Sequence, residues 1–93
     1  MIWEEMKFNI HSVYLLLLEA LKARYNYRND PDGIQFRNTK GRPFNIFVMG
    51  NAEPWKCVVV EYEDTGEDGG LYYPEDFDSY EAMLQAMLKE IEG

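Results

Sequence analysis

Residues 55–63 read Trp-Lys-Cys-Val-Val-Val-Glu-Tyr-Glu, and this stretch decides the fold. Its three successive valines, Val58, Val59 and Val60, are β-branched residues, which pack well on a pleated sheet. A short apolar run of this kind, with turn-forming residues before and after it, is typical of a buried strand. We therefore predict a central strand from Trp55 to Glu63.

Further strands are predicted on both sides of this stretch. Residues 34–37 (Ile-Gln-Phe-Arg) alternate between apolar and polar, residues 38–42 form a turn around a glycine, and residues 44–48 continue the period of two. These segments predict a hairpin, which the turn residues 50–54 separate from the central strand. After a loop at residues 64–70, Leu71-Tyr72-Tyr73 is predicted to be a short edge strand that ends at Pro74.

Two helices are predicted to flank the strands. Apolar residues from Ile10 to Tyr25 recur at helical spacing, with Asn9 as N-cap, and the Asn-Asp-Pro-Asp-Gly turn at residues 29–33 follows. Apolar residues from Tyr80 to Ile91 follow the same spacing, and Asp78 with Glu81 three residues later fits a capping-box-like start. The segment Met1 to Phe8 fits a strand or a helix equally well.

These elements predict an α+β fold. An N-terminal helix precedes a three- to four-stranded antiparallel meander sheet, and a C-terminal helix follows it. The simplest arrangement places both helices on one face of the sheet. A chain of 93 residues is long enough for one hydrophobic core and too short for two ordinary domains, so we expect a single acidic domain over residues 1–93.

The apolar and cysteine content point to a cytoplasmic protein. The one strongly apolar run, Val13 to Leu18, is far shorter than the roughly 20 residues needed to span a bilayer, so no membrane segment is expected. Cys57 is the only cysteine, which excludes an intramolecular disulfide. An oxidising compartment would therefore offer this fold no advantage.

Charge is distributed unevenly along the chain. Residues 1–45 carry seven Lys or Arg against five acids, whereas residues 46–93 carry two against twelve, so the halves have formal charges of +2 and -10. A strongly negative half repels phosphates, which argues against direct binding of nucleic acid through that half. It favours a basic partner, a cation or simple solubility.

Catalytic and cofactor motifs are absent from the sequence. His11 and Cys57 are the only residues from which a nucleophile and an imidazole base can be assembled, and Cys57 lies in a strand-like apolar run where a thiol is normally inert. No Walker loop, dinucleotide fingerprint or serine-hydrolase elbow occurs. A single histidine excludes a histidine-rich metal site. We expect a protein that is not an enzyme and that needs no cofactor or metal.

The loop from Asp64 to Glu75 partly matches the template of a calcium-binding loop. Only its third position, Gly66, departs from the pattern of acidic residues around a central glycine. However, the missing carboxylate removes a ligand, and the segment before the loop has the pattern of a strand, where an EF-hand requires a helix. A flexible acidic connection between strands is the preferred interpretation, and calcium binding remains an alternative.

Acids and aromatic residues alternate around this loop. Tyrosines give a large contact area at low entropic cost, and carboxylates beside them present a negative surface to an arginine-rich partner. The predicted partner-binding residues are Glu61, Glu63, Asp64, Glu67, Asp68, Tyr72, Tyr73, Glu75, Asp76 and Asp78. The competing interpretation places the aromatic side chains in the core and the acids on a solvated rim.

The size and charge of the chain predict a non-enzymatic protein-binding module that occupies a basic, nucleic-acid-binding protein. Phage inhibitors that mimic DNA, including anti-CRISPR proteins, and acidic immunity or antitoxin proteins rely on the same physics. The alternative is a homo-oligomeric structural or regulatory protein. Its sheet would pair with a second copy through Leu71 to Tyr73 or through the strand Trp55 to Glu63, and a homodimer is the simplest such form.

Overall fold

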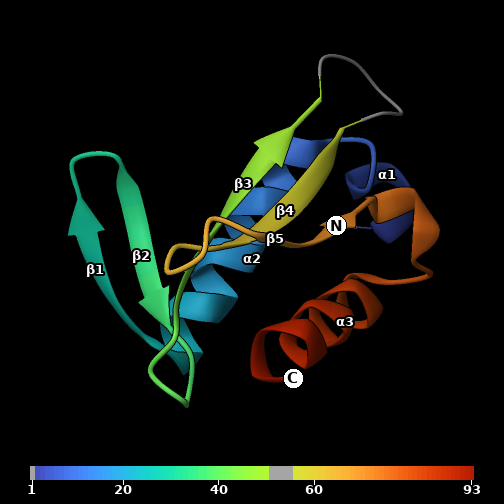
Figure 1. Cartoon of the computed structure of the whole chain (residues 1–93). Helices are drawn as coiled ribbons and strands as arrows, with labels where there is room; N and C mark the ends of the chain where they lie inside the picture. Colours follow the sequence, from blue (N-terminus) through green and yellow to red (C-terminus); the bar gives the residue numbers. More distant parts are fainter. Residues whose placement is uncertain (1, 51–55) are drawn as a thin grey trace.

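The computed structural model describes residues 2–50 and 56–93 (Figure 1). Its helices are α1 (Trp3–Met6), α2 (Ile10–Arg24), the 3₁₀ turn η1 (Pro74–Asp76) and α3 (Tyr80–Glu92). Its strands are β1 (Asn26–Asp30), β2 (Gly33–Arg37), β3 (Pro43–Met49), β4 (Cys57–Tyr62) and β5 (Asp68–Tyr72). Most of the predicted turn at 50–54 and the predicted strand residue Trp55 lie outside the described residues.

The five strands form one antiparallel meander in the order β1-β2-β3-β4-β5. The α+β class is confirmed, although the sheet has five strands where three or four were predicted. Residues Phe44–Met49 of β3 pair with Cys57–Tyr62 of β4 over their whole length. The predicted central strand is therefore confirmed as an internal strand, with β5 on its other side.

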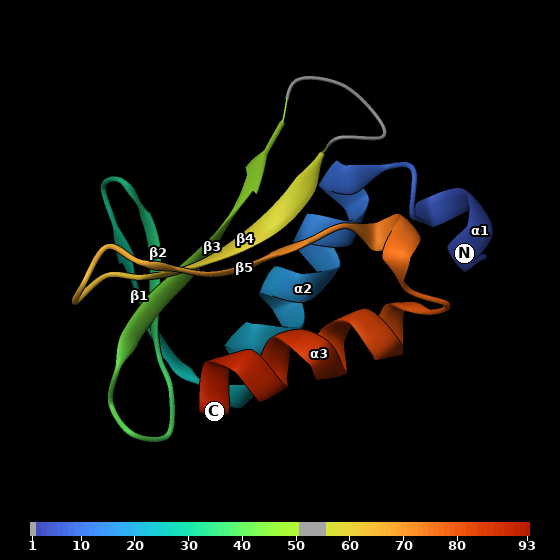
Figure 2. The same ribbon diagram turned by 45° about the vertical axis from the view of Figure 1, so that its right-hand side comes forward.

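Helices α2 and α3 lie on the same side of the sheet, as Figure 2 shows. The hydrophobic core lies between the helices and the sheet. Phe44, Ile46, Val58 and Val60 of the sheet belong to this core, with Leu17 and Leu21 of α2 and Met83 and Met87 of α3. Val59 points to the opposite face and is still fully buried, so β4 is covered on both faces.

Helix α2 starts as predicted and ends earlier than expected. The side chain of Asn9 accepts a hydrogen bond from the backbone N–H of Ser12, which confirms Asn9 as the N-cap. The helix ends at Arg24, and the next residues form the unpredicted strand β1. Nearly all of β1 is exposed, and the strand is held by pairing with β2. Its five residues, Asn-Tyr-Arg-Asn-Asp, give no apolar alternation that would reveal a strand.

Two element boundaries near the C-terminus also differ from the prediction. Helix α3 is capped by Ser79, whose hydroxyl accepts from the backbone N–H of Ala82, and not by Asp78. Strand β5 begins at Asp68, within the predicted loop, because Gly69 and Gly70 take part in the strand although glycine is a poor strand former. Gly69 is buried against Tyr62, where a Cβ atom would approach the tyrosine ring to 2.8 Å.

The N-terminal segment contains the short helix α1. The indole Nε1 of Trp3 donates a hydrogen bond of 2.8 Å to the backbone oxygen of Phe77, which fixes α1 beside the segment between η1 and α3. The open choice between strand and helix for Met1 to Phe8 is thus settled as a helix over Trp3–Met6. None of the helices in the described part of the chain is both long and apolar enough to cross a membrane.

Candidate functional site

The turn between β4 and β5, together with the strand ends beside it, carries half of the predicted partner-binding residues. Gly66 has a φ angle of 74°, which favours glycine, and its N–H donates to the Tyr62 carbonyl oxygen at 2.7 Å. The Tyr62 N–H donates to the Glu67 carbonyl oxygen at 2.9 Å, so the backbone of the turn is well defined. We call the carboxylates on this turn the acidic turn: Glu61, Glu63, Asp64, Glu67 and Asp68.

Like charges face each other across the strands at this turn. Glu61 of β4 and Asp68 of β5 lie directly opposite one another in the sheet. Within residues 2–50 and 56–93, neither of them forms a salt bridge, and the same holds for Glu63 and Glu67. A like-charge pair in this position is unfavourable by roughly 0.2–1 kcal/mol. The acidic turn therefore holds negative charge that folding alone does not require.

Only Asp64 of the acidic turn has a basic partner among the described residues. The Nε atom of Arg42 lies 3.1 Å from Asp64 Oδ2, and both side chains are partly exposed. The guanidinium of Arg42 also lies over the ring of Tyr62, 3.7 Å from its centroid. Arg42 therefore holds the base of the turn, while the other four carboxylates have no counter-ion within residues 2–50 and 56–93.

Tyr62 connects the acidic turn to the last helix. Its hydroxyl oxygen lies 2.8 Å from the Glu90 carbonyl oxygen and 2.9 Å from Glu90 Oε2. Burial, together with the hydrogen bond to Glu90, raises the pKa of Tyr62 to about 12. The phenol therefore stays protonated at neutral pH and holds the end of β4 against α3.

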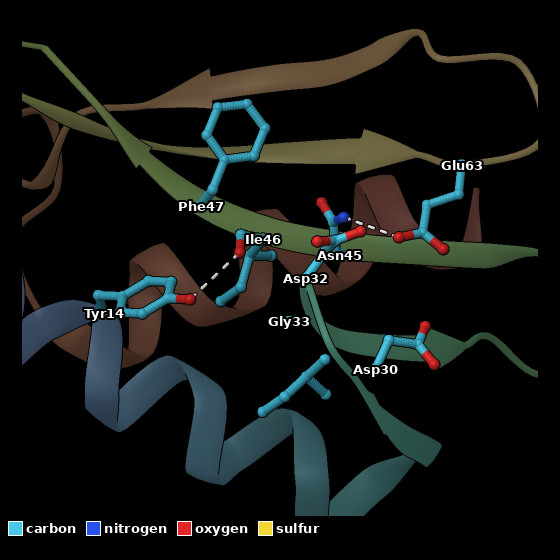
Figure 3. Close-up of a pocket in the computed structure, with 9 residues that line it drawn as sticks. Tyr14, Asp30, Asp32, Gly33, Asn45, Ile46, Phe47 and Glu63 are labelled. Atoms are coloured by element: carbon cyan, nitrogen blue, oxygen red, sulfur yellow. Dashed lines mark hydrogen bonds between the residues drawn. The ribbon is translucent and has the colours of Figure 1, made fainter.

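A cleft beside the acidic turn brings in residues that the sequence analysis did not select. It has a volume of about 390 Å³ and lies between β2, β3 and the β1–β2 turn (Figure 3). Glu63 lines it together with Asp30, Asp32 and Asn45. The amide nitrogen of Asn45 donates to Glu63 at 2.8 Å, whereas its Oδ1 atom is buried without a hydrogen-bond partner. Nothing in the sequence spacing relates Asp30 or Asp32 to Glu63.

The remaining predicted acids form a second group. Glu75, Asp76 and Asp78 follow β5 at the end opposite to the acidic turn, beside α1 (Figure 1). The predicted residues are therefore divided between the two ends of β5. Tyr72, between them, packs against the hydrophobic core and stacks on Phe77 with a centroid distance of 6.5 Å.

Cys57 and His11 show no sign of a catalytic pair. Cys57 is 1% exposed on the internal strand β4, and burial raises the pKa of its thiol. Tyr73 lies beside it, and the neighbouring Cys57 raises the pKa of the tyrosine. His11 is exposed on α2. A buried thiol with a raised pKa is a poor nucleophile.

The calcium-loop alternative does not fit the geometry. Strand β5 runs between Asp64 and Glu75, so the first and last positions of the proposed loop lie at opposite ends of a strand. Of the residues that the structure describes, no group of three or more His, Cys, Asp or Glu side chains is arranged to hold a metal ion.

Comparisons with other proteins give no lead to the function. No protein-family model matches the sequence, and no curated protein or solved structure matches it either. The function must therefore be argued from the residues and their geometry.

Proposed function

We propose that this protein is a binding module, acting without catalysis, whose acidic turn and adjoining cleft occupy a basic surface on a nucleic-acid-binding protein. The carboxylates take the place of phosphates on that surface, in the manner of phage-type DNA mimics and anti-CRISPR inhibitors. Such a partner is positively charged where it contacts nucleic acid, so the two surfaces attract over a distance comparable to the Debye length.

One observation carries this proposal: the unneutralised charges of Glu61 and Asp68, which face each other across β4 and β5. A sheet selected only for stability would place a cation or a neutral residue opposite one of them. Glu63 and Asp32 extend the same negative region into the cleft, whereas Asp30, which also lines it, forms a salt bridge of 3.0 Å with Arg28. A partner that supplies Lys or Arg side chains relieves this repulsion upon binding.

The proposal is tested by capture from the lysate of the native host, with the purified protein immobilised. The capture is performed at about 50 mM and again at about 500 mM salt, which brackets weak and strong screening. We expect a basic protein that binds at low salt, is released at high salt and is competed off by duplex DNA or RNA. Retention of the partner at high salt would contradict the proposal.

A matched pair of variants locates the binding surface. The double variant Glu61→Gln/Asp68→Asn removes two charges from the acidic turn. The control Glu5→Gln/Glu81→Gln removes two charges from exposed positions on α1 and α3. We expect the first variant to lose the captured partner and the control to retain it. Equal loss from both variants would indicate that only the net charge matters and would reject a specific surface.

The homo-oligomeric alternative has one supporting observation. Strand β5 is an edge strand of the sheet, and its Leu71 is 46% exposed. Strand β4 is paired on both sides, so the prediction that it offers an edge to a second copy was wrong. Light scattering of the purified protein separates the two proposals, because a monomer at high concentration excludes an obligate dimer.

A further inference from the structure

A second sheet edge lies inside the molecule, between β2 and β3. These strands pair only at Phe36 with Phe44 and at Arg37 with Pro43. Beyond this point the β1–β2 hairpin leans away from β3 and a V-shaped opening separates them, as the views in Figures 1 and 2 agree. Residues Asn45–Met49 of β3 therefore have β4 on one side and no strand on the other within the described chain.

The backbone groups on the open side of β3 can be identified. The N–H and C=O of successive strand residues point to opposite sides. The Arg42 carbonyl accepts from Asn38 across the β2–β3 hairpin, and the Pro43 carbonyl accepts from Glu63 after β4. Even-numbered residues of β3 thus point toward β2, which places the backbone groups of Ile46 and Val48 on the open side.

One side chain of the protein itself donates a long hydrogen bond to the open side of β3. The hydroxyl of Tyr14 on α2 donates to the Ile46 carbonyl oxygen at the long distance of 3.4 Å (Figure 3). The backbone groups of Val48 have no strand partner in the part of the chain that the structure describes. An unpaired strand edge of this kind is a template for an added strand.

The charges at the opening select a basic occupant. Figure 3 shows Asp30 and Glu63 toward one end of the cleft and Tyr14 toward the other. The buried Oδ1 atom of Asn45 still lacks a donor, and an unsatisfied buried acceptor is unfavourable. A guanidinium carries five N–H donors and a positive charge, so it suits the carboxylates of the cleft.

We propose that an extended, Arg- or Lys-containing segment of the partner adds to the sheet along the open edge of β3. Its backbone pairs with Ile46 and Val48, and a basic side chain enters the cleft beside Asp32 and Glu63. This inference rests on the proposed function and specifies the binding mode. In this binding mode, backbone pairing supplies the affinity for the partner, and the cleft supplies the preference for a basic side chain.

A second copy of the same chain is a poorer occupant. Pairing β3 with β3 of another copy would bring two clefts that each carry the carboxylates of Asp32 and Glu63 into one interface. Like charges brought into one interface oppose association, so self-pairing is disfavoured. A basic strand meets no such repulsion.

The test uses a fluorescent peptide of alternating Arg and Val residues as the probe, with fluorescence anisotropy as the readout. The variant Val48→Pro removes the outward N–H and leaves the pairing with β4 intact, because proline is tolerated at an edge. We expect it to weaken peptide binding by about tenfold or more, since it deletes a backbone hydrogen bond and obstructs the neighbouring ones. The control Val48→Ala keeps the N–H and should stay within about threefold of the wild type.

The wild-type protein provides an independent readout that needs no variant. With the peptide bound, amide hydrogen exchange at Ile46 and Val48 should slow by about tenfold or more, because their N–H groups become paired. A peptide with N-methyl groups on alternate residues keeps its charge and cannot pair along one edge. We expect that peptide to lose both the binding and the protection.

The outcomes separate this inference from the proposed function. If Val48→Pro and the N-methylated peptide bind normally while Glu61→Gln/Asp68→Asn weakens binding, the strand addition is wrong and the acidic-surface function stands. If none of these changes weakens binding, both proposals fail. If Val48→Pro instead abolishes a dimer of the protein, the occupant is a second copy and the inference is overturned.

Discussion

The two sides of strand β3 differ in backbone pairing and in the burial of the residues that face them. Toward β4, every residue from Phe44 to Met49 has a partner, and the facing valines Val58 and Val60 are fully buried. Toward β2, pairing ends after two residue pairs. The comparison teaches that one side of a strand can hold the fold together while the other side stays available for binding.

The difference follows from what each neighbour offers β3. Strand β4 presents consecutive β-branched residues, which bury well on both faces of a sheet. Strand β2 contributes the polar Gln35 and the side-chain-free Gly33. Because β2 pairs with β1 over its full length, the two strands diverge from β3 as one unit. Phe36, stacked on Phe44 with a centroid distance of 5.4 Å, and the neighbouring pair of Arg37 with Pro43 join the hairpin to β3.

The largest expected effect is at that junction. The substitution Phe44→Ala removes a fully buried ring that contacts both Phe36 and Tyr25. We expect it to lower the free energy of unfolding by about 3–5 kcal/mol, measured by urea denaturation. Phe47→Ala, on the half-buried opposite face, should cost clearly less. Equal losses would show that the buried ring of Phe44 contributes no more to the fold than the half-buried ring of Phe47.

A pair of proline substitutions tests the two sides of β3 directly. The N–H of Phe47 points toward β4, so Phe47→Pro removes a ladder hydrogen bond and should destabilise the protein by about 3 kcal/mol. The N–H of Val48 points to the open side, so Val48→Pro should change the stability by about 1 kcal/mol or less. Thermal and urea unfolding of both variants give the comparison. A reversed order would show that the assigned directions are wrong.

Alkaline pH should lower the free energy of unfolding, because Tyr62 loses its proton there. Its pKa is raised to about 12 from the ordinary 10.0, so folding favours the protonated phenol. The resulting stabilisation is complete below pH 10 and is lost as the pH rises toward 12. Tyr25 has a pKa raised to about 12 as well, by burial and its hydrogen bond to Glu92, and adds to the same decline.

The variant Tyr62→Phe separates the two tyrosines. We expect it to lose about 0.5–1.5 kcal/mol at neutral pH, because its hydrogen bond to Glu90 is gone. Between pH 10 and 12 its unfolding free energy should fall less steeply than that of the wild type. Tyr27→Phe, at a position that is 46% exposed, is the control and should follow the wild-type curve. An unchanged slope for Tyr62→Phe would reject the assigned role.

The smallest expected effect concerns the acidic turn. The double variant Glu61→Gln/Asp68→Asn should stabilise the isolated protein by about 0.2–1 kcal/mol, because it removes a cross-strand repulsion. The gain should shrink at high salt, where that repulsion is already screened. Loss of stability in this variant would mean that the two carboxylates serve the fold, and the case for a binding role would weaken.

The sequence was sufficient for the elements that bury apolar side chains. The helical stripe from Ile10, the hairpin around Gly41 and the valines of β4 each follow from local periodicity. Strand β1 does not follow from local periodicity. It is formed by pairing with β2 and by the contact of Tyr27 with Phe36, and neither is visible in the local sequence. The missed start of β5 has a similar cause, since Gly69 packs against Tyr62 and Gly70 against Tyr72.

The candidate site was only half predictable. The carboxylates of the acidic turn are close in sequence, so composition alone selected them. Asp30, Asp32 and Asn45 line one cleft with Glu63 only because the β1–β2 hairpin diverges from β3 and leaves a space between them. Such a departure from regular pairing depends on how a whole hairpin packs, and no motif or spacing in the sequence predicts it.

The buried cysteine makes opening of the sheet measurable by thiol labelling. Cys57 is the one thiol in the chain and is 1% exposed at the start of the internal strand β4. A thiol reagent can reach it only during moments when β4 is released, so the labelling rate measures how often the sheet opens. A partner that pairs with the sheet should slow this labelling whether or not it touches the cysteine, so its binding can be followed without attaching a label to the partner.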